Sequence, residues 1–242
     1  MTVTKGRLVL LALLVVACAA ADDQIEAAKE FVASYEAWHG TRHLRAQVHP
    51  MPSRAECLAA LPHLRAALQQ ADAELRQRIV NVAGWMYPLS DGFADALAGA
   101  LDDEDKGVRT RAATALAAFL PDADTVVPAL QKALDDQEAG VREAAALSLG
   151  VLGPSSAPAR DALKKQAESG PDPRARAAAV EALVRTDPEA ACPWVLKHLE
   201  SPSVECRMAA AWAARWARLS EPDVPQLASA LSRIVADPQA GH

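Results

Sequence analysis

Apolar and small residues recur along this chain in a repeating block. The segment VRTRAATAL, residues 108–116, returns as VREAAALSL at 141–149, and weaker copies begin at Leu75, Ala175 and Cys206, in steps of 33, 33, 34 and 31 residues. Within each copy, the small or apolar positions are spaced as on one face of a helix with 3.6 residues per turn. Each copy is therefore predicted to be a helix with a buried, alanine-rich face.

A second periodic block precedes each copy. Pairs of apolar residues four positions apart, such as Leu97 with Leu101 and Leu130 with Leu134, lead into a short turn. One helix–turn–helix unit cannot bury its apolar face alone, so such units stack. The predicted fold is an all-α, right-handed α-solenoid of about five antiparallel helix pairs. The predicted pairs are 54–70 with 74–86, 93–102 with 106–120, 125–136 with 140–152, 156–168 with 173–185, and 188–200 with 203–218.

An arginine follows the first position of every copy. Two turns also place an aspartate, Asp103 or Asp136, six residues before this arginine. We expect each aspartate to cap the second helix while its charge faces the arginine. The row is interpreted as a structural ladder, not as an anion-binding site. Its members are Arg76, Arg109, Arg142, Arg176 and Arg207.

The paired helices, the Asp–Val-Arg–Ala-Ala–Leu signature and a proline that recurs as Pro62, Pro128 and Pro193 resemble HEAT repeats. These prolines are expected in or near the first turns of the first helices. The resemblance is to the short repeats also seen in phycobilisome-lyase-like proteins, and it covers residues 54–237. The unit at 156–183 departs from it, with one extra residue and Gly170 in place of the aspartate. The resemblance implies a stacked scaffold.

The N-terminal segment, residues 1–21, has the pattern of a secretory signal peptide. Lys5 and Arg7 precede an apolar run at 8–17, and alanines 19–21 form a small-residue cleavage site. A run this short does not cross a hydrocarbon core of ~30 Å as a helix. An alternative is a lipobox ending at Cys18, whose lipid would be the sole membrane attachment. The protein is therefore expected in the periplasm, in the cell envelope or as a secreted protein.

The remaining segments divide into a capping helix and linker (22–53), the HEAT-like repeat domain (54–237) and a tail (238–242). An amphipathic helix at 23–38 and a last helix at 221–237 are expected to cover the two ends of the stack. A chain of 242 residues predicts one domain of ordinary size. The formal net charge of −6 argues against nonspecific nucleic-acid binding, which depends on clustered lysine and arginine.

The candidate partner-binding surface lies along the second helices. Positions six and ten residues into each copy point away from the buried alanines and include three tryptophans, a residue enriched at binding hot spots. In the alternative interpretation, the C-terminal two of these tryptophans pack beneath helix 221–237, and the first beneath the N-terminal helix. The candidate residues are Trp85, Leu147, Val151, Arg185, Trp212 and Trp216.

Other chemical groups do not form a recognisable site. His39, His43 and His49 are expected to be solvated loop residues, because no carboxylate or thiol lies at a metal-ligand spacing nearby. The three cysteines after residue 18, at 57, 192 and 206, are expected to be buried free thiols. No catalytic, metal or cofactor motif is found. The predicted function is an exported, non-catalytic scaffold that binds a protein or peptide on its concave surface; the alternative is a lyase-like or other enzyme.

Overall fold

The computed structural model describes residues 21–41, 52–88, 92–218 and 223–236, and these ranges contain helices and turns but no strand. The sequence predicts a single domain, whereas contacts divide the chain into two compact units, residues 1–118 (unit 1) and 119–242 (unit 2). A division of this kind arises in repeat proteins because each repeat packs only on its neighbours. The two units are described separately below.

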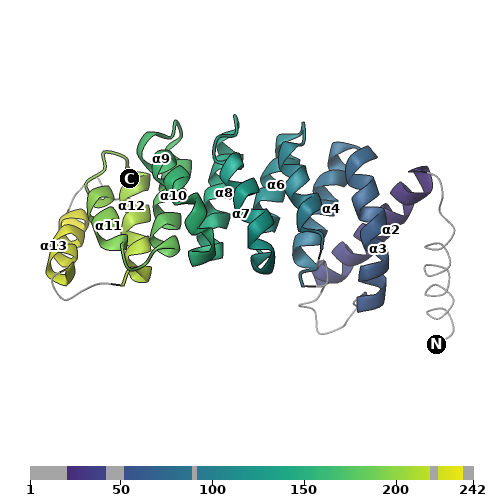
Figure 1. Ribbon diagram of the computed structural model, residues 1–242, viewed down its shortest axis with the longest axis horizontal. Helices are drawn as coiled ribbons and strands as arrows, with labels where there is room; N and C mark the ends of the chain where they lie inside the picture. The colour runs from purple at the N-terminus through teal and green to yellow at the C-terminus, as the bar shows by residue number, and fades with distance from the viewer. Residues whose placement is uncertain (1–20, 42–51, 89–91, 219–222, 237–242) are drawn as a thin grey trace. The chain divides into compact units, whose positions relative to one another are not determined.

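Unit 1 contains two helix pairs and the N-terminal helix. Helix α2 packs on α3 and α4, and α4 packs on α6 (Figure 1). Fully buried side chains such as Leu64, Ile79 and Leu116 form its core. Its elements are α2 (Ala21–Thr41), α3 (Arg54–Gln70), α4 (Ala73–Trp85), α5 (Ala94–Gly99), the 3-10 turn η1 (Ala100–Asp102) and α6 (Lys106–Leu116).

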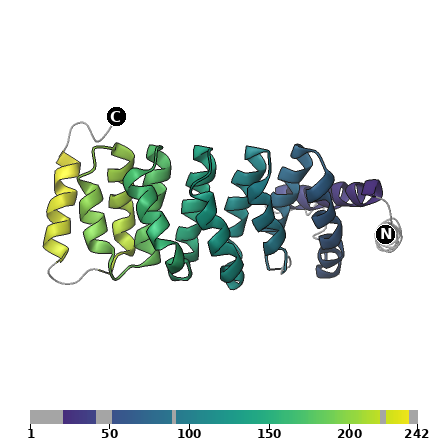
Figure 2. The ribbon, with the colours of Figure 1, turned by 45° about the horizontal axis from the view of Figure 1, so that its top comes forward.

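Unit 2 contains three helix pairs and the C-terminal helix. The second helices α8, α10 and α12 lie side by side, whereas α13 packs on the first helix α11 (Figure 2). Leu130, Leu149 and Leu163 are fully buried between the helices. Its elements are η2 (Leu120–Asp122), α7 (Ala123–Ala133), α8 (Ala139–Leu152), η3 (Gly153–Ala159), α9 (Arg160–Ser169), α10 (Pro173–Thr186), α11 (Ala191–Leu199), α12 (Val204–Ala213), η4 (Ala214–Trp216) and α13 (Asp223–Ala236).

The predicted all-α architecture of helix pairs is confirmed, and each predicted helix is found, α3 with the predicted ends and the others with shifted ends. At residues 156–168, α9 begins only at Arg160 because the 3-10 turn η3 precedes it, and at 203–218, α12 ends at Ala213 because the 3-10 turn η4 follows it. Gly153, at φ 58°, ends α8 in a backbone conformation that favours glycine. The right-handed sense of the stack remains a prediction.

The recurring prolines occupy different places in their helices. Pro193 is in the first turn of α11, as expected, but Pro62 and Pro128 lie inside α3 and α7. The expectation of a position near the first turn is therefore wrong for Pro62, which is the ninth residue of its helix. All three prolines are exposed, so water can solvate the carbonyl that loses its helical donor.

Adjacent second helices approach each other closely at glycine. A Cβ atom built on Gly150 of α8 would lie 3.0 Å from Cα of Ala182 in α10. In unit 1, a Cβ atom on Gly84 of α4 would lie 2.9 Å from Cβ of Ala115 in α6. The alanine-rich face predicted from the repeat is thus the contact between consecutive second helices.

The arginine ladder binds backbone carbonyl groups at the turn between the helices of a pair. The Nη1 atom of Arg109 donates to the carbonyl oxygen of Asp103 at 2.8 Å, and Arg142 donates to that of Asp136 at 2.7 Å. Arg176 and Arg207 make the same bond to Gly170 and Ser201. Carbonyls after the end of a helix lack an intrahelical donor, and the guanidinium supplies one.

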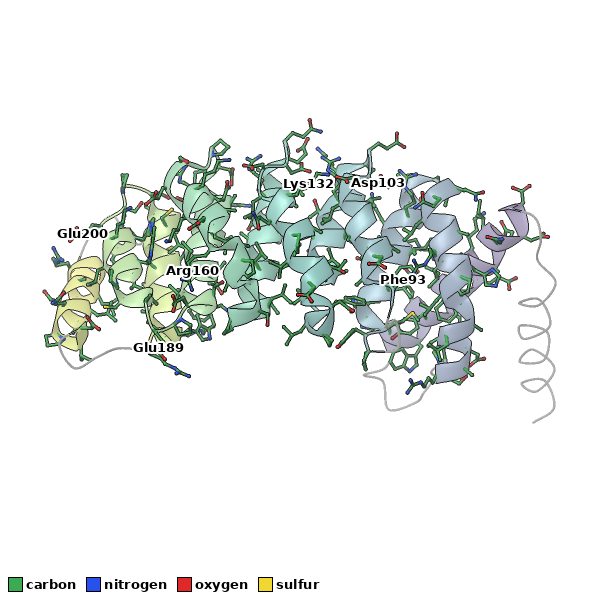
Figure 3. All side chains as sticks on the ribbon, in the orientation of Figure 1. Phe93, Asp103, Lys132, Arg160, Glu189 and Glu200 are labelled. Carbon is green, nitrogen blue, oxygen red and sulfur yellow. The ribbon has the colours of Figure 1, made fainter. Side chains whose placement is uncertain are left out.

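The prediction that Asp103 and Asp136 cap the second helices is wrong. The N-cap of α6 is Asp105, whose Oδ1 accepts from the amide of Val108 at 2.9 Å. Asp103, labelled in Figure 3, instead accepts from the amide of Asp105 and pairs with Arg76 of the preceding repeat at 2.8 Å. Asp103 therefore orders the turn and links neighbouring repeats, whereas the N-cap is the residue directly before α6, Asp105.

Several expectations lie outside the described residues. These concern the signal segment 1–20, Cys18 within it, and two loop histidines, His43 and His49. No single described helix combines the length and apolar character that a membrane span needs. Only the segments Lys106–Leu116 and Leu120–Ala133 taken together meet such a test, by length and composition alone.

Candidate functional site on the second helices

A hollow of about 310 Å³ runs across the second helices of unit 2. We call it the second-helix groove. Leu147, which lines it, is 41% exposed, and Val151, one helical turn further along α8, is 52% exposed. Exposed apolar side chains beside polar ones mark interaction sites more often than single scattered ones do. The residues that line the groove are Glu143, Leu147, Arg174, Ala177, Ala178, Glu181, Glu205 and Ala209.

Carboxylates outnumber cations in the groove. Glu143, Glu181 and Glu205 line it together with one arginine, Arg174. The hydroxyl of Ser203 donates to Glu205 at 2.7 Å, and this bond, with Arg174 and Arg176 nearby, holds the pKa of Glu205 below its usual value. Glu205 is therefore ionised at neutral pH and does not serve as a proton donor there. The groove offers apolar contacts with negative charge around them.

The two C-terminal tryptophans form a cluster with arginine. Arg215 lies over both rings, with its guanidinium carbon 3.6 Å from the ring centroid of Trp212 and 3.8 Å from that of Trp216. Arg185 also lies over Trp216, with its guanidinium carbon 4.8 Å from the ring centroid. Stacking of this kind fixes long cationic side chains on a surface.

The interpretation that Trp212 and Trp216 pack beneath the last helix is wrong. Trp212 is 57% exposed and Trp216 is half-buried. The last helix, α13, packs instead on α11, in the position of the first helix of a further pair. The apolar stripe of α13 includes Leu227 and Ala230, which are buried. The helix that α13 covers is the first helix α11, not the second helix α12.

Trp85 belongs to unit 1 and contacts the N-terminal helix. Its ring stacks on that of His39 at 4.0 Å between centroids, and its carbonyl oxygen accepts from the hydroxyl of Tyr35. Trp85 is nevertheless 45% exposed. His39 is thus part of the α2–α4 contact and not a solvated loop residue.

The three cysteines that the structure describes are free and buried, as predicted. Burial raises the pKa values of the Cys57 and Cys192 thiols, which keeps them protonated. Cys192 is near the start of α11, and Figure 3 shows Glu189 and Glu200 at opposite ends of this helix. Among the described residues, no group of three or more histidine, cysteine or acidic side chains is placed to hold a metal ion.

The sequence pattern did not single out Met208 and Arg215, two exposed residues of the α12 region. Arg215 occupies the offset at which Gly150 packs against the next second helix, whereas the offset of Met208 corresponds to Glu143 and Ala177, which line the groove. No second helix follows α12 within the described residues, and this is why both side chains lie on the surface.

The chain was compared with known families and structures. The HEAT repeats profile matches residues 61–150, 94–183 and 160–241. Among solved structures, a chain of the complex of CpcE and CpcF of phycocyanin lyase from Nostoc sp. PCC7120 is 27% identical, with a TM-score of 0.51, over 81% of this chain and 75% of that one. A crystal structure of an engineered protein is 17% identical, with a TM-score of 0.56, over 91% of this chain and 97% of that one.

A comparison with curated proteins gave no match. The two solved structures support the repeat fold, and the engineered protein supports the fold alone. The three matches to the family profile cover well over half of the sequence. The chain belongs to the HEAT-repeat family.

Proposed function

We propose that this protein is an exported, non-catalytic HEAT-repeat scaffold that binds a protein or peptide partner in the second-helix groove. The observation that carries the proposal is the exposure of Leu147 and Val151 beside the groove of three helices. Stacked helix pairs present extended surfaces of this kind to partners. The similar chain of phycocyanin lyase also belongs to a complex of two proteins, CpcE and CpcF.

The chemistry of the groove specifies the partner further. Apolar side chains between Glu143, Glu181 and Glu205 favour a segment that carries apolar residues flanked by lysine or arginine. The net charge of the chain, −6, also favours a positively charged partner segment. No cofactor and no nucleic acid is part of this proposal.

Photocrosslinking in cells tests the partner site. A photoreactive amino acid at position 147, 151 or 181 should capture the same partner, because these side chains lie on one face. The matched control is position 161, whose aspartate side chain is 98% exposed on the first helix α9. Equal capture at 161, or none at the three groove positions, would contradict the site.

Export is tested separately at the N-terminus. We propose that residues 1–21 direct the chain out of the cytoplasm and are either removed before Asp22 or cut so that Cys18 becomes lipid-bearing. Mass spectrometry of the mature N-terminus distinguishes the two routes, and a Cys18→Ala variant should abolish only the second. An uncleaved chain in the cytoplasm would contradict both.

A lyase-like enzyme is the second candidate, favoured by the 27% identity to a chain of the phycocyanin lyase complex. The described residues offer it little support, because the described thiols are buried and Glu205 is held ionised. Likeness of fold is in any case a weak argument for activity. Purified protein that binds a chromophore and transfers it to an acceptor protein would establish this candidate instead.

A further inference from the structure

The edge of α12 has the position of a stacking face on which no second helix of the described residues packs. In α8 and α10, the residues nine positions into the repeat are Gly150 and Val184, and both are buried. Gly150 touches Ala182 of the next second helix. The corresponding residue after α12 is Arg215, which is exposed, and Met208 on the same side is 62% exposed.

The exposed residues of this edge form one stripe. Glu205, Met208, Trp212 and Arg215 follow one another at spacings of three, four and three residues, which places them along one side of α12 and of the 3-10 turn η4 that continues it. All four are exposed. The same spacing marks the seam of two packed helices in a coiled coil. We call these four residues the α12 stripe.

The stripe is complementary to itself in an antiparallel arrangement. Its first residue is an acid, its last is a base, and its two middle residues are large and apolar. When two such helices pack antiparallel about a twofold axis, Met208 of each faces Trp212 of the other, and Glu205 faces Arg215. In a parallel arrangement, Glu205 would face Glu205 and Arg215 would face Arg215, so like charges would meet. Antiparallel helix dipoles favour the same arrangement.

We propose that the α12 stripe is a self-association surface, on which a second copy of this chain packs its own α12 in the antiparallel direction. The contact takes the place that a further second helix would occupy in the stack. It goes beyond the binding of a partner in the second-helix groove and does not depend on it, although the two surfaces share Glu205. A contact of one helix pair is smaller than the ~1,600 Å² of a typical stable interface, so the dimer is expected to be weak, with Kd in the micromolar range.

Sedimentation of the full chain tests the proposal without any partner. Between about 1 and 200 µM, the weight-average mass should rise from monomer toward dimer. Glu205→Arg and Arg215→Glu should each weaken dimerisation about tenfold, since like charges then face each other. The two changes combined should restore it to near the wild-type value. Monomer at every concentration, or a double variant no tighter than the single ones, would overturn the proposal.

Two further variants keep this test clear of folding effects and of the groove. Met208→Ser should abolish the dimer and leave the melting temperature unchanged, because the side chain is exposed. Val151→Ser is the matched control, since Val151 is exposed on α8 outside the stripe, and it should leave dimerisation intact. A dimer lost with Val151→Ser and kept with Met208→Ser would place self-association on the groove face and refute the stripe.

Discussion

At the scale of single residues, the arginine that recurs in each repeat stabilises a turn and is not part of the binding surface. The arginine of each repeat could be assigned from the sequence because it recurs in five copies. Its acceptors could not, because a guanidinium beside an acidic turn suggests carboxylates, and the position of a backbone carbonyl depends on the fold. Arg109 donates through Nη1 to the carbonyl oxygens of both Asp103 and Glu104. The ladder therefore stabilises the turn within each helix pair.

Removal of a ladder arginine should destabilise the protein. Arg109→Ala removes the donor of two part-buried hydrogen bonds to carbonyl groups, so the free energy of unfolding should fall by about 1–3 kcal/mol. Arg111→Ala is the control, because its side chain is exposed, and it should change stability by less than about 0.5 kcal/mol. Urea unfolding followed by circular dichroism measures both. Similar values for the two variants would remove the ladder from the account.

The buried thiols should resist modification in the folded state. Cys57, Cys192 and Cys206 are buried, and the raised pKa values of the first two keep the thiolate scarce. A thiol reagent at neutral pH should therefore label these three sites only after unfolding. Site-resolved mass spectrometry separates them from Cys18. Rapid labelling of all three in the native protein would show that the helices pack differently.

At the scale of elements, contacts between second helices decide the architecture. The sequence predicted these contacts through its alanines, and Gly150 against Ala182 confirms how close they are. It did not predict the place of α13, because an amphipathic stripe shows that a helix is covered but not by which neighbour. The exposure of Trp212 follows from that single difference.

Gly150→Ala tests the close approach of α8 and α10. An added Cβ atom would lie 3.0 Å from Cα of Ala182, a backbone atom that cannot move alone. Overpacking should cost about 1–3 kcal/mol, although alanine is the better helix former. Gly99→Ala, with nothing within 4 Å, should instead stabilise by roughly 0.5–1 kcal/mol. Stabilisation by both changes in thermal melts would argue against the contact.

The N-cap of α6 should give a pH-dependent contribution to stability. The pKa of Asp105 lies below its ordinary value of 3.8, chiefly because its carboxylate accepts from the amide of Val108 and then from Gln77. This stabilisation is complete above the unfolded pKa and is lost as the pH falls through the lower folded pKa. Asp105→Ala should therefore lower the melting temperature at pH 7, and its difference from wild type should shrink in strong acid.

The control for this prediction is Asp161→Ala, which removes a carboxylate with a 98% exposed side chain. It should change the melting temperature little at either pH. A deficit of Asp105→Ala that stayed constant down to strong acid would show that the charge of the cap is not what stabilises α6.

At the scale of the whole molecule, two compact units each build a layer of second helices over their own core. Periodicity predicted the helix pairs, and the family was indicated by the resemblance of the repeat signature and the recurring proline to HEAT repeats. Helical spacing placed Leu147 and Val151 away from the buried alanine face. It could not predict the groove beside them, because side chains from three helices form that groove. The exposure of Met208 and the stacking of Arg215 on tryptophan could not be predicted from the repeat pattern, because both residues belong to the last repeat.

Hydrogen–deuterium exchange of the protein with and without its crosslinked partner tests the central claim, that the second helices of unit 2 form the binding surface. Slower exchange should be confined to peptides that cover α8, α10 and the start of α12. Protection centred on the first helices α7, α9 and α11, with the second helices unchanged, would contradict it.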